Sequence, residues 1–281
     1  MISGSLLIDK EVGVTSRQEV NKISKKLKEK KAGHIGTLDP FADGLLIVLL
    51  GSSTKISPFL ETMDKKYLAT LKLGEKTNSG DLTGDVIEAK YVPLLTKEFV
   101  TKKLEKFIGE QKQLPPMLSA IKVNGKQLYK YAREGIEIER KERTINIFDI
   151  KLISLSKNEL TFMAHVSKGT YIRTLGEDIA KELGTVGHLT KLTRVAIGPY
   201  TLENAKKSDE ISQTDLIPVD KMLAHIPSVI LDEAESKKAM NGMTLKINSN
   251  HDLLLVKNIN EVIAIYKKQS NGVYSCLRGL R

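Results

Sequence analysis

The apolar positions of this chain repeat with different periods in different segments. The run LLIVLL at 45–50 is continuous and predicts a strand that is buried on both faces. Apolar residues at helical spacing predict helices over 15–33, 96–108 and 170–183, and other apolar segments predict strands over 4–8, 67–73, 144–154 and 160–167. The first helix is expected to begin with a capping box at Thr15 and Gln18 and to end near Gly33. The chain therefore mixes helices and strands.

Two segments depart from this pattern. Residues 113–135 contain a double proline, a short strand, an Asn-Gly turn and a short amphipathic helix, so we expect an excursion from the sheet. From about Val229 onward, short strands are separated by turns at Asn241-Gly242, 248–250 and Asn271-Gly272. This spacing predicts a small, separate β-rich module, so we expect one domain over 1–228 and a second over 229–281.

Asp39 lies in GHIGTLDPFADGL, residues 33–45, between three glycines and directly before Pro40. Proline disfavours helical backbone in the residue before it, and glycines allow sharp turns and the close approach of a partner. The loop is therefore expected to present the Asp39 carboxylate. The alternative is a glycine-rich turn in which Asp39 caps a backbone amide.

Arg173 lies in the first turn of a predicted helix, where the positive end of the helix dipole disfavours a cation. This placement suggests a compensating anion. If that anion is a buried Asp39, the arginine should lower the pKa of the carboxyl and fix its orientation, and an ionised, oriented aspartate suits nucleophilic attack. The alternative is a surface arginine paired with Glu177 one turn along the helix.

The chain is basic, with 44 Lys and Arg residues against 34 Asp and Glu residues and a formal net charge of +10. Such a charge attracts polyanions, which favours nucleic acid over the alternative of a merely basic housekeeping protein. The absence of Trp and an aromatic content of 5% argue against binding mainly by base stacking, so structured RNA fits better. The outer face of the first predicted helix suits either solvation or phosphate binding, and it carries Lys22, Lys25, Lys26, Lys28, Lys30 and Lys31.

Other classes of protein are disfavoured by composition. Cys276 is the only cysteine and the five histidines are scattered, so we expect neither a disulfide framework nor a cysteine-rich zinc site, and no catalytic metal. No apolar run approaches the ~20 residues that span a bilayer, and the start of the chain lacks the long apolar segment of a signal peptide. We therefore expect a cytoplasmic protein without a membrane anchor.

Several segments resemble the motifs of one enzyme family, the TruB family of bacterial tRNA pseudouridine synthases. The similar segments are DKEVGVTS (9–16), GHIGTLDPFADGLL (33–46), GSSTK (51–55), KKYLATLKLG (65–74), TNSGDLTG (77–84), SKGTYIRTL (167–175) and HLTKLTRVAIGPY (188–200). The resemblance implies an α+β fold with a central, mostly antiparallel sheet, an inserted thumb at about 112–143 that closes over the T arm of tRNA, and a short RNA-binding module of the PUA type at 229–281.

The same resemblance implies an activity and its residues. The reaction would be the isomerisation of uridine 55 to pseudouridine in the T loop, by base flipping and attack of Asp39, without a cofactor or metal and without an obligatory protein partner, in a monomer. Asp39, Tyr67 and Arg173 would be catalytic. The residues expected to contact the substrate RNA are His34, Lys10, Lys55, Asp81, Leu192 and Arg194.

Three positions depart from the family pattern: Glu11, Arg17 and Thr193 stand where proline, histidine and a paired arginine are usual. None is a proposed catalytic residue, so these changes are expected mainly to lower phosphate affinity. A non-catalytic protein that binds or folds tRNA on the same scaffold is the alternative. A metal-dependent RNA-processing nuclease would need a close cluster of carboxylates that the sequence lacks.

Overall fold

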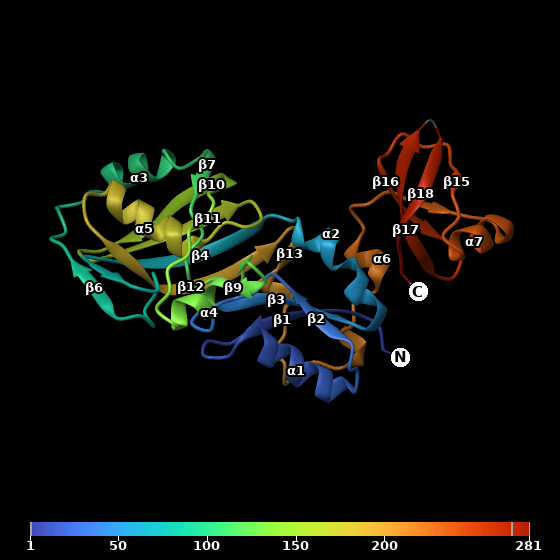
Figure 1. Ribbon diagram of the computed structural model, residues 1–281, viewed down its shortest axis with the longest axis horizontal. Coiled ribbons are helices and arrows are strands. Elements are labelled where there is room, and N and C mark those ends of the chain that lie inside the picture. Colours follow the sequence, from blue (N-terminus) through green and yellow to red (C-terminus); the bar gives the residue numbers. More distant parts are fainter. Residues whose placement is uncertain (1, 271, 281) are drawn as a thin grey trace.

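The computed structural model describes residues 2–270 and 272–280 of the chain. Figure 1 shows an elongated molecule, in which a long sheet forms the body and a smaller sheet near the C-terminus stands at one end. The expected mixture of helices and strands is confirmed. The expected capping box at Thr15 and Gln18 is also present.

The body is built on a nine-stranded sheet. Its main path runs in the order β1 (Gly4–Lys10), β3 (Asp43–Leu50), β12 (Gly187–Ile197), β4 (Lys65–Leu73), β11 (Glu159–Val166), β10 (Arg143–Leu155) and β7 (Gly109–Gln113). Two short strands, β2 (Ala32–Ile35) and β13 (Tyr200–Thr201), pair with β3 and β12. Only the pairing of β12 with β3 is parallel within this sheet, so the prediction of a mostly antiparallel sheet is confirmed.

Strand β3 is buried on both faces, as its continuous apolar sequence predicts. Residues 46, 48 and 50 share a core with Val20 and Ile23 of α1 (Ser16–Leu27). Residues 45, 47 and 49 share a core on the other face with Ile56 of η1 (Gly51–Ile56) and Leu60 of α2 (Ser57–Glu61). The strand therefore gives the loop that precedes it a rigid anchor.

A third core lies between the β4, β11 and β10 part of the sheet and two helices. It contains apolar residues of α3 (Lys97–Glu105) and α5 (Ile172–Glu182) together with residues of β4, β10 and β11. A small hairpin, β5 (Glu75–Thr77) and β6 (Val86–Ala89), extends this end of the body, and the predicted turn-rich loop 77–85 joins its strands.

The first helix is shorter than its sequence pattern suggests. It ends at Leu27, and Lys28 takes a left-handed conformation with φ of 56° while its N–H donates to the carbonyls of Ser24 and Lys25. The prediction that the helix ends near Gly33 is wrong, because Gly33 belongs to β2 and pairs with Leu49. Lysine, glutamate and alanine favour helix, but only by tenths of a kcal/mol per residue, so backbone hydrogen bonds to a buried strand outweigh this preference.

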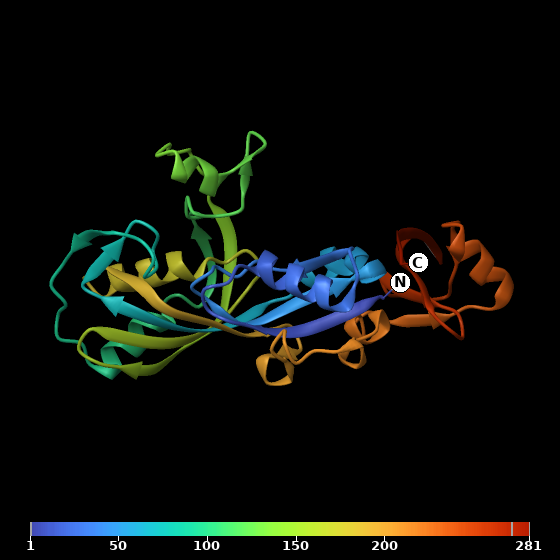
Figure 2. The ribbon, with the colours of Figure 1, turned by 90° about the horizontal axis from the view of Figure 1, so that it is seen from below.

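A projecting segment, residues 114–142, connects β7 and β10, and we call it the thumb. It contains a two-stranded hairpin, β8 (Lys122–Val123) and β9 (Lys126–Gln127), followed by α4 (Leu128–Arg133). Asn124 and Gly125 form the predicted turn with φ values of 50° and 80°, a geometry typical of two-residue hairpin loops. Figure 2 shows this segment, in green, standing away from one face of the body.

The C-terminal part of the chain forms a second, five-stranded sheet, and we call residues 229–280 the C-terminal module. Its order is β14 (Ser228–Ile230), β16 (Leu253–Lys257), β17 (Val262–Ser270), β18 (Val273–Gly279) and β15 (Leu245–Lys246). Helix α7 (Glu233–Met240) was not predicted, although Asp232 caps it by accepting a hydrogen bond from the Glu235 N–H at 2.7 Å. Of the expected Asn271-Gly272 turn, Asn271 lies outside the described residues.

The link between the two sheets includes two short 3₁₀ turns, η2 (Leu202–Asn204) and η3 (Gln213–Asp215), and α6 (Val219–Met222). Leu255, Ile265 and Leu280 of the C-terminal module pack into the same core as Leu223 and Ile226 of the link. The module is therefore joined to the body by a shared apolar core. No helix within the described residues is both long and apolar enough to cross a membrane.

Candidate active site

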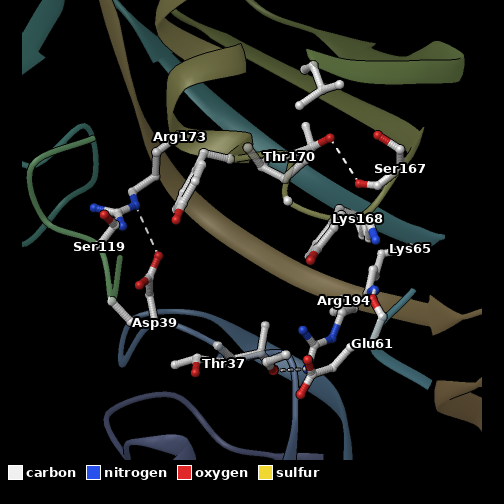
Figure 3. A pocket seen from close by; sticks show the side chains of 18 of the residues that line it. Thr37, Asp39, Glu61, Lys65, Ser119, Ser167, Lys168, Thr170, Arg173 and Arg194 are labelled. Atoms are coloured by element: carbon white, nitrogen blue, oxygen red, sulfur yellow. Dashed lines mark hydrogen bonds and ion pairs between the residues drawn. The ribbon is translucent and has the colours of Figure 1, made fainter. Parts of the chain in front are cut away.

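A cavity of about 660 Å³ opens beside β4, β12 and the N-terminus of α5. Figure 3 shows that side chains from distant parts of the sequence converge on it. The predicted residues that line it are Asp39, Tyr67, Arg173, Leu192 and Arg194. A cavity of this size suits a ligand such as a single nucleotide.

Asp39 lies on the loop between β2 and β3. The loop is tied to α1, because the N–H of Leu38 donates to Ser16 Oγ at 2.9 Å. Asp39 Oδ2 lies 3.0 Å from Arg173 Nε, and about a third of the Asp39 side chain is exposed. The loop thus presents the carboxylate to the cavity, as expected, and orients it by an ion pair.

Arg173 is the centre of the polar network. Its side chain is 5% exposed, and it is in the first turn of α5, as predicted. Besides the contact with Asp39, its Nη1 donates to the carbonyl of Ser79 at 3.0 Å, and its Nη2 donates to the carbonyl of Leu118 in the thumb at 2.7 Å. The alternative of a surface arginine paired with Glu177 is therefore wrong.

Asp81 is a second carboxylate on the same arginine. Its Oδ2 lies 3.5 Å from Arg173 Nη1, and the residue is 4% exposed. Its Oδ1 accepts hydrogen bonds from Ser79 Oγ at 2.8 Å and from the Thr83 N–H at 2.9 Å. Asp81 therefore braces Arg173 from within the protein, whereas the sequence interpretation assigned it to RNA contact.

The pKa of Asp39 is set by the balance between its burial and the charges around it. Burial raises the pKa of Asp39 above its ordinary value, and the nearby Asp81 carboxylate adds to this rise. Arg173 and, more weakly, Lys10 oppose it. Arg173 lowers this pKa, as predicted, but desolvation outweighs the ion pair, so the net shift is upward. A raised pKa makes the carboxylate a stronger base and nucleophile once it is ionised.

Tyr67 and Leu192 reach the cavity from neighbouring strands. In the pairing of β4 with β12, Tyr67 lies opposite Arg194, and Leu192 lies opposite Ala69. Leu192 is buried, and Tyr67 packs at the edge of the third core. Together they give the cavity an apolar wall beside Asp39, suited to the face of a nucleobase.

The other predicted RNA-contacting residues are placed differently. His34 is half-buried in β2, where its Nε2 lies 3.2 Å from Thr37 Oγ1, and burial lowers its pKa. Lys55 is half-buried in η1, outside the cavity lining. Lys10 is fully buried, and its ammonium donates to the carbonyls of Glu11 and Val14 at 2.8 and 2.7 Å. Burial lowers the pKa of Lys10 to about 8.

The cavity also has cationic residues that sequence reasoning missed. Arg143 at the start of β10 and Lys168 before α5 are exposed at its rim. Lys65 is buried in its wall, where its ammonium donates to the carbonyls of Glu61 and Met63, and burial lowers its pKa to about 8. Lys65 and Lys168 belong to the recognised KKY and SKGT segments, which was a signal that could have identified them.

None of the positions that depart from the family pattern lines the cavity. Glu11 is exposed and lies 3.8 Å from Lys207, and Arg17 is exposed on α1. Thr193 is half-buried in β12, opposite Leu68. Across the described ranges, no three His, Cys, Asp or Glu side chains are grouped so that they could hold a metal ion.

Comparisons with known proteins show which sequences this chain resembles. Residues 24–172 match the family model described as the TruB family pseudouridylate synthase N-terminal domain. A protein of Hydrogenovibrio crunogenus named tRNA pseudouridine synthase B is 44% identical over 257 residues, which cover 90% of this chain and 85% of the relative. A Burkholderia mallei protein of the same name is 42% identical, with 88% and 84% coverage.

Solved structures share the fold at lower identity. A chain from a crystal structure of a Cbf5-Nop10-Gar1 complex superimposes with a TM-score of 0.75 at 23% identity, covering 99% of this chain and 85% of the other. A chain from an H/ACA RNP bound to a substrate RNA containing 2′-deoxyuridine gives a TM-score of 0.72 at 22% identity, with the same coverage. At these identities the likeness establishes the fold.

Proposed function

Since the chain belongs to the TruB family of pseudouridylate synthases and is an isomerase that acts on tRNA, we propose that its target is uridine 55 in the T loop and that Asp39 is its nucleophile. The observation that carries this proposal is the ion pair of Asp39 with the buried Arg173 at the wall of a nucleotide-sized cavity. A preorganised carboxylate in such a place is suited to covalent catalysis.

The reaction exchanges one bond to the ribose for another. The bond between C1′ and N1 of uracil breaks, the ring turns, and a bond between C1′ and C5 forms, while C5 loses a proton to solvent and N1 gains one. Asp39 attacks the flipped nucleotide, and Arg173 holds the carboxylate in position. Extruding the base costs a few kcal/mol, which contacts in the cavity and along the backbone offset.

The remaining site residues have supporting roles in this proposal. Tyr67 and Leu192 hold the faces of the flipped uracil, and His34, beside the loop of Asp39, fills the space that the base leaves. Asp81 holds Arg173. Lys10 acts on Asp39 through its charge, because its ammonium is occupied by backbone carbonyls.

RNA outside the cavity is bound by cations of the thumb, of η1 and of the C-terminal module. We propose that the thumb contacts the T arm through Lys122 and Lys130 and that Lys55 and the C-terminal module contact other phosphates. Because its relatives act on tRNA, we propose that this protein works in the cytoplasm. We also propose that it is a monomer without a protein partner. Light scattering after gel filtration measures the oligomeric state.

Tritium release from tRNA labelled at uracil C5 tests the proposal, with the wild type and Asp39→Asn compared in EDTA. We expect release of one tritium per tRNA by the wild type, none by Asp39→Asn, and tRNA binding by both within a few fold, because the substitution changes charge at nearly constant shape. Asp85→Asn, which changes an exposed aspartate on the β5–β6 loop, is the matched control and should retain full activity.

The substrate arm uses tRNA that carries cytidine at position 55. Release from this tRNA would refute the assignment to uridine 55, and activity of Asp39→Asn would refute the nucleophile. Saturable binding without release by the wild type would favour the alternative, a protein that binds and folds tRNA.

A further inference from the structure

Arg194, in β12, is a buried arginine whose hydrogen bonds go to the two ends of the loop that carries Asp39. Its side chain is among the most deeply buried in the described part of the chain, with 1% of the residue exposed. Its Nη2 donates to the carbonyl of Gly36 at 3.0 Å, and its Nε donates to the carbonyl of Leu45 at 2.8 Å. One planar guanidinium therefore joins the residue that opens the loop to the strand that follows it.

The backbone of Arg194 is held between the same loop and the strand of Tyr67. Arg194 pairs with Gly44 in the parallel contact of β12 with β3, and it lies opposite Tyr67 in the antiparallel pairing of β12 with β4. Gly44 has φ of 95°, and a Cβ there would lie 2.5 Å from the carbonyl oxygen of Arg194. The close approach requires glycine at this position.

The charge of Arg194 is not neutralised by a neighbouring carboxylate. Among the residues that the structure describes, no Asp or Glu forms an ion pair with it, and its side chain donates to two backbone carbonyls. Burying a cation without a counterion costs free energy. The structure shows one compensation for this cost, which is the pair of hydrogen bonds that Arg194 donates to the loop and to β3. With 1% of the residue exposed, it offers little surface to a phosphate of the substrate.

We propose that Arg194 is a positioning residue for the isomerisation: it fixes the loop of Asp39 relative to Tyr67 across the cavity, instead of binding RNA phosphate. The inference rests on the proposed roles of Asp39 and Tyr67. A displacement of about 1 Å at a reacting group can cost ~10²-fold in rate. The expected consequence of loosening Arg194 is therefore a loss of rate with little loss of affinity.

The test compares Arg194→Lys and Arg194→Met with the wild type in single-turnover tritium release at saturating tRNA, beside tRNA dissociation constants measured at several salt concentrations. Lysine keeps the charge but cannot donate two fixed hydrogen bonds to both carbonyls. We expect both variants to lose about 10²-fold in rate and to bind tRNA within a few fold of the wild type with an unchanged salt slope. The contrast is Arg143→Met, which should weaken affinity and lower the salt slope by about one.

The opposite split would overturn the proposal. If Arg194→Met weakens binding and lowers the salt slope while the rate at saturation is kept, Arg194 is a phosphate ligand. Full activity of both Arg194 variants would refute the positioning role. An inactive Asp39→Asn in the same assay would still support Asp39 as the nucleophile. If neither variant folds, hydrogen exchange of the wild type decides. The loop amides of Leu38 and Ala42, which donate hydrogen bonds, should be protected like those of β3, and exchange as fast as in the thumb would refute the proposal.

Discussion

Replacing Arg173 with methionine removes a side chain that contacts Asp39, Asp81 and the thumb together. Methionine fills much of the same volume without a charge or a donor, so the change leaves two carboxylates and the carbonyls of Ser79 and Leu118 without this partner. We expect a loss of both stability and turnover.

The loss of stability follows from the burial of the two carboxylates. Breaking a buried ion pair from one side costs about 3–5 kcal/mol. Asp39 contributes less of this than Asp81, because about a third of its side chain is exposed whereas Asp81 is buried. Asp81 is buried, but it keeps hydrogen bonds from Ser79 and Thr83, which favours the lower end of the range, about 3 kcal/mol. For a chain of this size that corresponds to a fall in Tm of about 6–12 °C.

The loss of turnover follows from the orientation of Asp39. Removing one preorganised electrostatic contact from an active site costs about 10²–10³ in rate, and Arg173 supplies the contact that Asp39 has in the cavity. The assay is single-turnover tritium release at saturating tRNA, with thermal unfolding of the same preparations. Arg173→Lys should recover more of the stability than of the rate, because it keeps the charge but not the fork of donors.

Lys151→Met, at an exposed position on β10, controls for the loss of one positive charge and should leave Tm and rate unchanged. The reasoning is refuted if Arg173→Met loses less than about 1 kcal/mol of stability and keeps its rate within about tenfold.

Three further outcomes are expected. The single-turnover rate should fall at low pH as Asp39 is protonated, with an apparent pKa above the ordinary value for aspartate. Asp81→Asn removes a like charge, so it should shift this fall in rate to lower pH. An unshifted pH profile would exclude an effect of Asp81 on Asp39. Burial lowers the pKa of Lys10 to about 8, so between pH 8 and its ordinary pKa of 10.5 this side chain binds fewer protons in the folded state than in the unfolded state. The free energy of unfolding of the wild type, measured by urea titration, should therefore rise with pH in this window relative to that of Lys10→Met. The same pH dependence in both proteins would contradict the prediction. Replacing both Lys122 and Lys130 by glutamine should lower the salt slope of tRNA binding by about two, and an unchanged slope would show that these thumb cations do not contact phosphate.

Much of the site could be located from the sequence because its residues lie in motifs with clear local geometry. Asp39 before Pro40 and Arg173 in the first turn of a helix each indicate an unusual side-chain placement, and their pairing is present in the structure. The apolar run of β3 predicted its burial on both faces, since a strand covered on one side would alternate.

The functions of individual cations were harder to predict, because they depend on which atoms the fold brings close. Lys10 and Arg194 were expected to contact RNA, yet both donate to backbone carbonyls inside the protein. Those acceptors have no side-chain signature in the sequence. The effect of Arg173 on the pKa of Asp39 was predicted, but the net direction of the shift was not, because it also depends on desolvation, which only the three-dimensional structure gives.

The thumb joins the body through β7 and β10, and none of the four apolar cores of the described chain includes a residue of 114–142. Its hydrogen bond to Arg173 is made by the backbone carbonyl of Leu118, which any amino acid supplies. Mutations can therefore accumulate in this segment during evolution without loss of the fold or of the Arg173 network. The thumb is the part of the scaffold through which a lineage can change the RNA that it recognises while inheriting the same chemistry.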